Sequence, residues 1–404
     1  MAMKAAATNA AQPAIAPRGF TAGAAKAGVK TGIAERLDVG LILSDRPCVA
    51  AGVFTTNQVI AAPCVLTRKH LESGTLRGIV VNSGNANACT GDEGDRAAVA
   101  MVEAAAKVMG CAPREVGVAS TGVIGWQLPV DRISAAIAAI RPTADGFDDF
   151  SRAIMTTDTK PKVATAEANV DGVTIRALGI AKGSGMIHPN MATLLGFVVT
   201  DAQIAADDLR AITRRAADRS FNAISVDGDT STNDTLLVLA NGAAAAKGTS
   251  EGAIAAAGAI VSRVCDLLAR QIVADGEGVT KVFEVRVSGA ASSADAKRAA
   301  RTITTSNLVK TAIHGADPNW GRILAAAGRS GARVDDRKAT IRIGSLEVFR
   351  TGRPVPFDPD ALRAIFSKAE IPIEVDLALG AGEATAWGTD LSEEYVRINA
   401  DYTT

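Results

Sequence analysis

The amino-acid sequence predicts an α+β protein in which layers of helices lie outside packed sheets. Three observations lead to this prediction. The chain has 404 residues, which is enough for two or three domains. Hydrophobic residues make up 48% and charged residues 21%, so the chain can bury a large core. Helix and strand patterns occur in separate clusters, without the strict alternation of a βαβ fold.

The first part of the chain contains one strand pattern and two helix patterns. An apolar run at 79–81 predicts a short strand that leads into a polar, Asn-rich segment. A helix is expected at 91–108, because this stretch is rich in Ala and is followed by Gly110 and Pro113. A second helix is expected at 131–140, where apolar residues recur at i, i+3, i+4 and i+7.

A hairpin and a Gly-rich loop follow in the middle of the chain. We expect the hairpin at 166–178, because Asp171-Gly172 can form a tight turn between two extended segments. After the loop, the pattern predicts an apolar strand at 194–199 and then a helix from Asp201 to about Arg219.

The last part of the chain is expected to hold a long helix and several half-buried strands. The helix ends at Val273, and the Ser250 side chain can cap its first turn. Alternation of apolar and charged residues predicts strands at 283–287, 339–350 and 371–379, with a last short strand at 395–399.

Charge and cysteine content argue against several classes of protein. Lys+Arg and Asp+Glu both number 43, so the chain has no net field to hold a nucleic acid or an anionic membrane, and we expect a small-molecule ligand. The five cysteines are scattered and lack CxxC spacing, which argues against a zinc site or a disulfide framework. We interpret them as reduced, mostly buried thiols of a cytoplasmic protein.

Residues 1–17 are interpreted as a flexible tail. The first 20 residues are Ala-rich and lack the continuous apolar region of a secretory signal. A transit peptide stays a minor alternative, because no acidic residue precedes Glu35. No run approaches the ~18 apolar residues of a membrane span.

The segment KGSGMIHPNMAT (182–193) carries the clearest chemical signal. Two glycines and a proline fix an irregular backbone just before a strand, which suits a strained loop that feeds a rigid element. The hydroxyl of Thr193, at the head of the strand, can attack the carbonyl of Ala192 and split the chain there. The freed α-amine of Thr193, with an ordinary pKa of about 7.7–8.0, can then act as general base for its own hydroxyl.

The residues alone leave another interpretation of this segment open, since Gly-rich loops often precede strands and Thr is favoured in strands. A phosphate-binding P-loop is excluded, because Leu178 stands where that motif needs a Gly and a strand follows instead of a helix. The acidic stretch that contains Asp227, Asp229 and Asp234 is superficially similar to a calcium loop. It lacks the spacing and the terminal Glu of an EF-hand, so we reject calcium.

Eight motifs in consistent order resemble the ornithine acetyltransferase (glutamate N-acetyltransferase) family. They span residues 18–404, and the segment 182–193 is similar to the autoproteolysis motif of that family, in which the bond before Thr is cut. The other seven motifs are NSGNANACTG (82–91), STGVIG (120–125), TTDTKPK (156–162), SFNAISVDGDTSTNDT (220–235), DGEGVTK (275–281), IHGADPNWGRI (313–323) and INADYTT (398–404).

The resemblance implies a role for each matching residue. Thr193 is the nucleophile, and the bond between Ala192 and Thr193 is the cleavage site. Thr121 and Gly122 match the family's oxyanion hole, whose donors stabilise the developing negative charge by roughly 3–4 kcal/mol each. The family's substrate contacts correspond to Thr156, Lys182, Thr193, Glu277, Asn399 and Thr404, and Thr157 beside Thr156 leaves a one-residue ambiguity.

The resemblance also implies a reaction and an assembly. The reaction is transfer of the acetyl group from N2-acetylornithine to glutamate in arginine biosynthesis, by a ping-pong mechanism through acetyl-Thr193, with no metal or organic cofactor. Whether acetyl-CoA is a second donor stays open. The implied fold is the α/β sandwich of Thr-nucleophile aminopeptidases, cut into an alpha fragment (18–192) and a beta fragment (193–404) that stay together as α2β2.

Two alternatives to this function are kept. The nearer is a Thr-nucleophile amidohydrolase or aminopeptidase of related fold, which would release the acyl group to water. The other is a binding protein that keeps the fold without catalysis; the full set of matching site residues argues against it.

Overall fold

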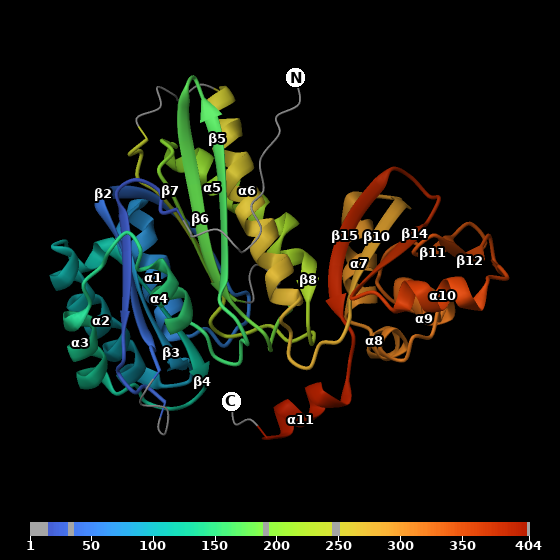
Figure 1. The fold of residues 1–404 in the computed structure, drawn as a ribbon, viewed down its shortest axis with the longest axis horizontal. Coiled ribbons are helices and arrows are strands. Elements are labelled where there is room, and N and C mark those ends of the chain that lie inside the picture. Colours follow the sequence, from blue (N-terminus) through green and yellow to red (C-terminus); the bar gives the residue numbers. More distant parts are fainter. Residues whose placement is uncertain (1–14, 31–35, 189–193, 245–250, 402–404) are drawn as a thin grey trace.

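The computed structural model describes residues 15–30, 36–188, 194–244 and 251–401. Figure 1 shows two lobes, each built around one sheet, with a short C-terminal helix below them. The N-terminal lobe holds an eight-stranded sheet and the C-terminal lobe a seven-stranded sheet, counted over the described residues. Two sheets with helices packed on them confirm the predicted α+β class.

The first sheet has the strand order β4-β3-β2-β9-β7-β6-β5, and β1 pairs with β2. Its strands are β1 (Phe20–Ala25), β2 (Val39–Phe54), β3 (Thr75–Asn85), β4 (Val116–Val123), β5 (Lys162–Val170), β6 (Val173–Lys182), β7 (Leu195–Thr200) and β9 (Thr235–Ala240). Every residue of β7 and β9 is buried, because α5 and α6 cover one face of these strands, and the other face packs against residues of β1–β4 and against α4.

Helices pack against the two halves of this sheet. One group is α1 (Ala62–His70), α2 (Gly91–Met109), α3 (Val130–Ala139) and α4 (Phe147–Ala153). The other group, on the opposite side in Figure 1, is α5 (Ala206–Arg219) and α6 (Glu251–Val273). Under α4, the Phe150 ring packs edge-on against Phe197 of β7, with 5.7 Å between the ring centroids.

By length and composition alone, α6 could cross a membrane. Half of its apolar window is nevertheless buried inside the protein, and Val261, Val264 and Leu268 are fully covered by the sheet and α5. Its hydrophobicity is therefore that of a core helix in the N-terminal lobe.

The second sheet has the strand order β13-β12-β11-β14-β10-β15-β8. Its strands are β8 (Ile224–Ser225), β10 (Val282–Ala290), β11 (Thr340–Ile343), β12 (Leu346–Arg350), β13 (Arg353–Pro354), β14 (Glu370–Asp376) and β15 (Gly382–Thr389). The helices of this lobe are α7 (Ser293–Thr304), α8 (Asn307–His314), α9 (Trp320–Gly328) and α10 (Pro359–Phe366). Since β8 belongs to this sheet and β9 to the first, the connection 226–234 runs from one lobe to the other.

Most predicted elements agree with the structure in type and position. The hairpin at 166–178 is the turn between β5 and β6, where Asp171 and Gly172 both have positive φ angles of 51° and 82°. The stretch 339–350 is a hairpin of two strands, β11 and β12, in which Gly344 has a φ of 60°. Ser250, the expected cap of α6, lies outside the described residues.

Two predictions need correction. The helix expected from Asp201 begins at Ala206, because the Asp201 carboxylate instead accepts a hydrogen bond from Arg176 N at 2.7 Å and pairs with Arg18. The strand predicted at 395–399 is wrong, because this segment lies in helix α11 (Glu393–Asp401). The short alternating pattern YVRIN has no neighbouring strand among the described residues, so it forms local hydrogen bonds instead.

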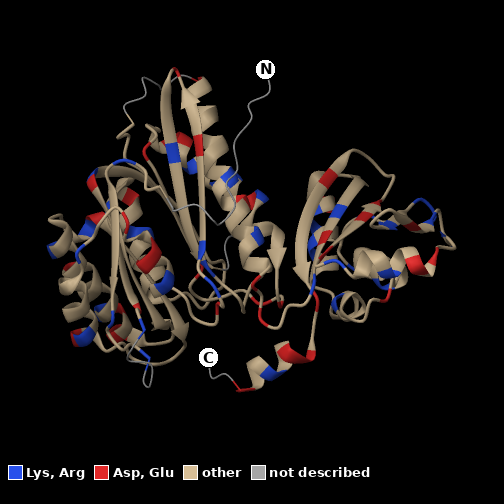
Figure 2. Cartoon of the chain, in the orientation of Figure 1, with Lys and Arg blue, Asp and Glu red and all other residues tan. Residues whose placement is uncertain are grey.

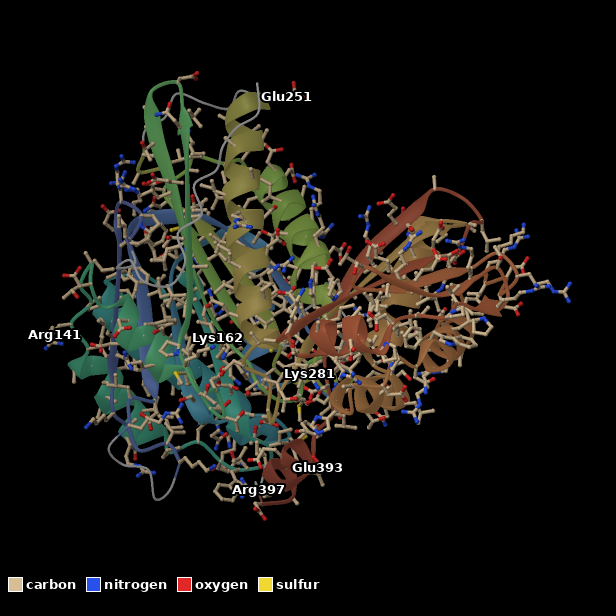
Figure 3. The ribbon with its side chains drawn as sticks, turned by 45° about the vertical axis from the view of Figure 1, so that its right-hand side comes forward. Arg141, Lys162, Glu251, Lys281, Glu393 and Arg397 are labelled. Carbon is tan, nitrogen blue, oxygen red and sulfur yellow. The ribbon has the colours of Figure 1, made fainter. Side chains whose placement is uncertain are left out.

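Charged residues of both signs are spread along both lobes, as Figure 2 shows. Arg141 and Arg397 lie at the periphery, whereas Lys162 lies inside the N-terminal lobe (Figure 3). All five cysteines are free thiols, and three of them are buried. Burial raises the pKa of Cys48 and Cys64 to about 12, so both are neutral, inert core residues at pH 7.

Candidate active site

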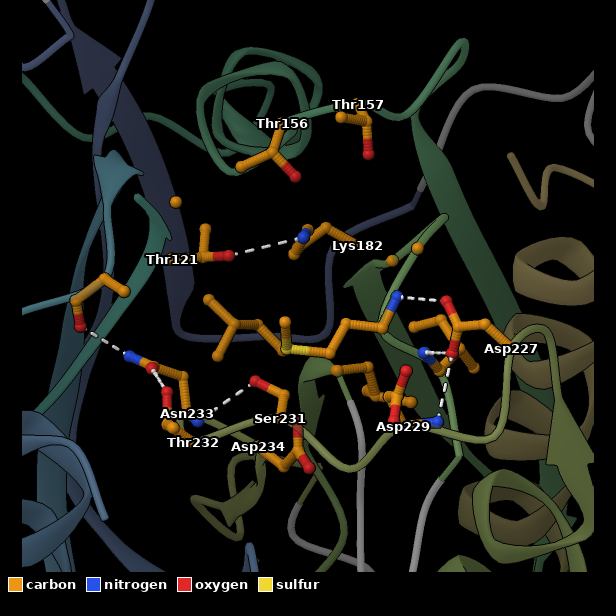
Figure 4. A pocket seen from close by; sticks show the side chains of 18 of the residues that line it. Thr121, Thr156, Thr157, Lys182, Asp227, Asp229, Ser231, Thr232, Asn233 and Asp234 are labelled. Atoms are coloured by element: carbon orange, nitrogen blue, oxygen red, sulfur yellow. Dashed lines mark hydrogen bonds between the residues drawn. The ribbon is translucent and has the colours of Figure 1, made fainter. Parts of the chain in front are cut away.

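A pocket lies where the ends of β4 and β6, the connection 226–234 and helix α11 meet (Figure 4). It brings together six of the residues predicted from sequence: Thr121, Gly122, Thr156, Lys182, Glu277 and Asn399. Thr157 also lines the pocket, so the choice between it and Thr156 is not settled by position. Ala192, Thr193 and Thr404 lie outside the described residues. Leu194, the next residue after Thr193, lines the pocket.

The pair Thr121-Gly122 lies at an irregularity between two parallel strands. The register of β3 and β4 shifts where Asn85 pairs with both Thr121 and Val123. Gly122 has a φ of 134°, and a Cβ atom there would lie 2.2 Å from the carbonyl carbon of Gly84. Only glycine fits this position, so the backbone beside Thr121 is held in a conformation that other residues rarely adopt.

Lys182, the last residue of β6, points at Thr121 across the pocket (Figure 4). Its Nζ donates a hydrogen bond to Thr121 Oγ1 at 3.3 Å, and only 8% of the residue is exposed. Burial lowers the pKa of Lys182, while the nearby Asp158 carboxylate acts in the opposite direction. A hydroxyl and an ammonium group thus share one corner of the site, where they can donate to an anionic oxygen.

A buried ion network beneath Lys182 was not found by sequence reasoning. Lys162 Nζ is 2.6 Å from Asp158 Oδ1 and 2.6 Å from Asp275 Oδ2, and Lys162 is 1% exposed. Asp158 Oδ1 also accepts from Gly183 N at 2.7 Å, which fixes the backbone just after Lys182. Burial raises the pKa of Asp158, but the Lys182 and Lys162 charges outweigh it and lower the value to about 2.

One signal for this network was present in the sequence. Asp158 and Lys162 lie four residues apart in the motif TTDTKPK. Because no helix was predicted there, this spacing did not predict that the two side chains form an ion pair. Asp275 is 113 residues further along than Lys162, and only the folded chain brings them together.

Glu277 lies on the opposite side of the Gly-rich loop. Its backbone N donates to Ser184 O at 3.1 Å, and its Oε2 accepts from Asn399 Nδ2 at 2.9 Å. A Cβ atom on Gly185 would lie 2.3 Å from the same Oε2, so the absence of a side chain at Gly185 makes room for the carboxylate. Asn399 and Tyr395, which also lines the pocket, thereby link α11 to the site.

The described part of the pocket lining is strongly acidic. Asp227, Asp229, Asp234 and Glu277 stand against a single lysine, Lys182. Such a lining favours a ligand that carries a cationic group together with one carboxylate. Asp227 was considered in the sequence only as part of a calcium loop, but its carboxylate accepts backbone hydrogen bonds from the Gly-rich loop.

Comparison with known proteins gives a consistent relationship. The model of the ArgJ family matches residues 21–404. The arginine biosynthesis bifunctional protein ArgJ of Symbiobacterium thermophilum is 52% identical over 394 residues, which cover 96% of this chain and 98% of the relative. The protein of the same name from Dehalococcoides mccartyi is 48% identical over 391 residues, covering 96% of each chain.

Two solved structures of similar proteins overlap with about half of the chain. An arginine biosynthesis bifunctional protein from Bacillus halodurans is 41% identical, with a TM-score of 0.48, over 51% of this chain and 98% of that chain. Ornithine acetyltransferase from Mycobacterium tuberculosis, solved in complex with ornithine, is 39% identical, with a TM-score of 0.43, over 47% of this chain and 100% of that chain.

The family match and the identity over nearly full length support the same assignment, which the eight sequence motifs had predicted. This chain belongs to the ArgJ family, and it is an enzyme of the acetyltransferase class.

Proposed function

We propose that this enzyme transfers the acetyl group of N2-acetylornithine to glutamate in arginine biosynthesis, after cutting its own chain between Ala192 and Thr193. The observation that carries the proposal is the single pocket in which Thr121, Gly122, Lys182 and Glu277 meet directly beside Leu194. These residues come from three separate segments of the chain, and they supply the donors and charges that acetyl transfer from an amino acid requires.

In the first half-reaction, the Thr193 hydroxyl attacks the acetyl carbonyl of N2-acetylornithine, and the free α-amine of Thr193 takes the hydroxyl proton. The Thr121 hydroxyl and the Gly122 N–H stabilise the oxyanion. The C–N bond of the substrate then breaks, the proton passes to the leaving amine, and ornithine departs from acetyl-Thr193.

Substrate recognition uses the two charged sides of the pocket. Lys182 pairs with the α-carboxylate, supported by the Thr121 hydroxyl at 3.3 Å. Glu277 meets the side-chain ammonium of ornithine, and Asn399 holds that carboxylate through the 2.9 Å hydrogen bond. Thr156, on the opposite wall in Figure 4, and Thr404 complete the proposed set of substrate contacts.

In the second half-reaction, the α-amine of glutamate attacks the acetyl-Thr193 ester. N-acetylglutamate leaves and the Thr193 hydroxyl is restored. In this proposed reaction neither half-reaction uses a metal or an organic cofactor. Acetyl-CoA could serve as an additional acetyl donor to the same hydroxyl, and assays with and without it distinguish a one-donor from a two-donor enzyme.

Maturation uses the same hydroxyl. Thr193 Oγ attacks the Ala192 carbonyl, the peptide C–N bond breaks and an ester forms, and water hydrolyses the ester to leave a carboxylate on Ala192. We propose that the fragments 1–192 and 193–404 stay associated as α2β2. A cytoplasmic location is also proposed and is supported by the five free thiols.

Denaturing mass spectrometry of the purified protein beside its Thr193→Ala variant tests the proposal. We expect two fragments that meet at Ala192/Thr193 in the wild type and one intact chain in the variant. Incubation with N2-acetylornithine alone should add 42 Da to the fragment that begins with Thr193, the mass of one acetyl group in place of a hydrogen.

Steady-state kinetics decide between transfer and hydrolysis. Parallel initial-rate lines with N2-acetylornithine and glutamate are expected for a ping-pong enzyme. Release of acetate without glutamate-dependent N-acetylglutamate would identify an amidohydrolase instead. An intact wild-type chain with no acetyl adduct would overturn the assignment of Thr193.

A further inference from the structure

The connection 225–230 holds the chain just before the proposed cut. Asp227 Oδ2 accepts from Met186 N at 2.6 Å, and Asp227 Oδ1 accepts from Ile187 N at 2.8 Å (Figure 4). Val226 N donates to Ile187 O at 2.7 Å, and Thr230 Oγ1 donates to His188 O at 3.0 Å. Four hydrogen bonds therefore fix three consecutive residues of one segment to the other.

The start of β9, at the end of the longer segment 225–235, holds the chain just after the proposed cut. Thr235 N donates to Leu194 O at 2.8 Å, and β7 continues from there in parallel register with β9. The two described ends that flank the cut, His188 and Leu194, are thus attached to Thr230 and Thr235, which are five residues apart.

The held segment has an unusual backbone. Met186 has a φ of 55°, a region that residues other than glycine rarely occupy. The Asp227 carboxylate accepts two hydrogen bonds from this turn, from Met186 N and Ile187 N, in addition to a longer one from Asp229 N at 3.3 Å. A carboxylate that accepts two N–H groups stabilises a turn that the local sequence would not keep by itself.

Lys310 fixes the connection from the C-terminal lobe. This residue of α8 is 2% exposed, and its Nζ donates to Val226 O at 2.5 Å and to Thr389 O at 2.6 Å. Within the described residues no carboxylate lies in hydrogen-bond contact with this ammonium, although the charges of Asp227 and Asp390 act on it and raise its pKa against the effect of burial. Burying an ammonium group costs free energy unless it is hydrogen-bonded. The carbonyl oxygens that accept from Lys310 offset this cost, and one of them belongs to Val226, the residue before Asp227.

We propose that the segment 225–235 is the template for self-cleavage, with Asp227 as its central positioning residue and Lys310 as its support. By attaching the chain on both sides, at 186–188 and at Leu194, the segment sets the positions from which the backbone enters and leaves the stretch that is cut. It takes no part in the bond changes described above. The inference rests on the proposed self-cleavage and assigns its geometry to residues other than the proposed nucleophile and oxyanion hole.

The test measures cleavage rate on full-length precursor made by cell-free synthesis, followed over time by denaturing mass spectrometry. Asp227→Asn keeps the shape of the side chain but removes its charge and replaces one accepting oxygen with an NH2 group, so only one of the two N–H groups of the turn keeps its acceptor. We expect cleavage at least about tenfold slower than in the wild type. Thr230→Val is nearly isosteric, removes only the bond to His188 O, and should slow cleavage several-fold without disturbing the fold.

Asp201→Asn is the matched control. Asp201 is a fully buried carboxylate that accepts from Arg176 N far along the same sheet, so its loss should lower the unfolding temperature yet leave the cleavage rate unchanged. Wild-type rates in both Asp227→Asn and Thr230→Val, with a wild-type chain that does cleave, overturn the template. A wild-type chain that never cleaves overturns the proposed maturation instead.

Discussion

At the scale of single residues, Gly122 shows how tightly the site depends on backbone contact. Its φ of 134° and the 2.2 Å that would separate a Cβ from Gly84 leave no space for a side chain. Gly125, three residues later and just after the end of β4, has a φ of 85° but no atom within 4 Å of its would-be Cβ. A side chain at Gly125 would therefore meet conformational strain alone, whereas a side chain at Gly122 would meet both strain and a steric clash.

We expect Gly122→Ala to lower the free energy of unfolding by about 3 kcal/mol or more, because strain and a backbone clash act together. Gly125→Ala should cost only about 1 kcal/mol, from strain alone. Thermal unfolding of the two variants side by side measures the difference, and equal midpoints would contradict the steric argument.

The sequence could predict which residues line the site better than it could predict the buried ion pairs and hydrogen bonds that hold them. The motif resemblance selected Thr121, Lys182 and Glu277, because each stands in a short, specific run of letters. It could not select the Lys162–Asp275 ion pair, because that contact depends on how β5 meets the end of α6. Side chains that position others have weak local patterns, since their partners lie far away in the sequence.

At the scale of elements, α11 is held by few contacts. None of its described residues is buried, and Val396 is 61% exposed. Its attachments are Asn399 to Glu277, Tyr395 in the pocket lining, and Ser392 just before the helix, whose Oγ donates to Gly278 O at 2.6 Å. A helix that buries so little apolar surface adds little to stability, so its value lies in what it brings to the pocket.

Removing residues 393–404 should therefore change catalysis more than stability. We expect a kcat/KM at least about tenfold lower, because Glu277 loses the Asn399 amide, and an unfolding midpoint within about 2 °C of the wild type. Removing only 402–404 tests the predicted contact of Thr404. Unchanged KM and kcat in both truncations would remove the C-terminus from the site.

Elements with long periodic patterns were predicted well, and short ones were not. The helix at 91–108 and the hairpin at 166–178 have clear periodicity and turn residues, and both are present. The five residues 395–399 fit a strand and a helix equally, and the absence of a described strand beside them decided for the helix.

At the scale of the whole molecule, one contact between the lobes is sensitive to pH. His188, just before the proposed cut, has its Nε2 2.8 Å from a guanidinium nitrogen of Arg301 on α7. Burial, and then the Arg301 charge, lower the pKa of His188 to about 4. The neutral imidazole accepts the Arg301 hydrogen bond, and the protonated form cannot.

Because the unfolded chain binds a proton at His188 near pH 6.5 and the folded chain only near pH 4, the folded state binds fewer protons in this window. The stabilising effect is complete above about pH 6.5 and is lost as the pH falls toward 4. We expect the unfolding midpoint to fall over this range, and His188→Gln to flatten the fall. Identical pH profiles for the variant and the wild type would contradict the assignment to His188.

The strand order of the first sheet has a further consequence if the chain is cut at Ala192–Thr193. The strands β2 and β6 precede the cut, and β9 and β7, which follow it, lie between them. Strands of both products therefore already pair in one sheet before the products become separate chains. The two fragments therefore need no diffusional encounter to associate, and one precursor chain yields them in equal numbers. An affinity tag on either end of the precursor should recover both fragments in a one-to-one ratio.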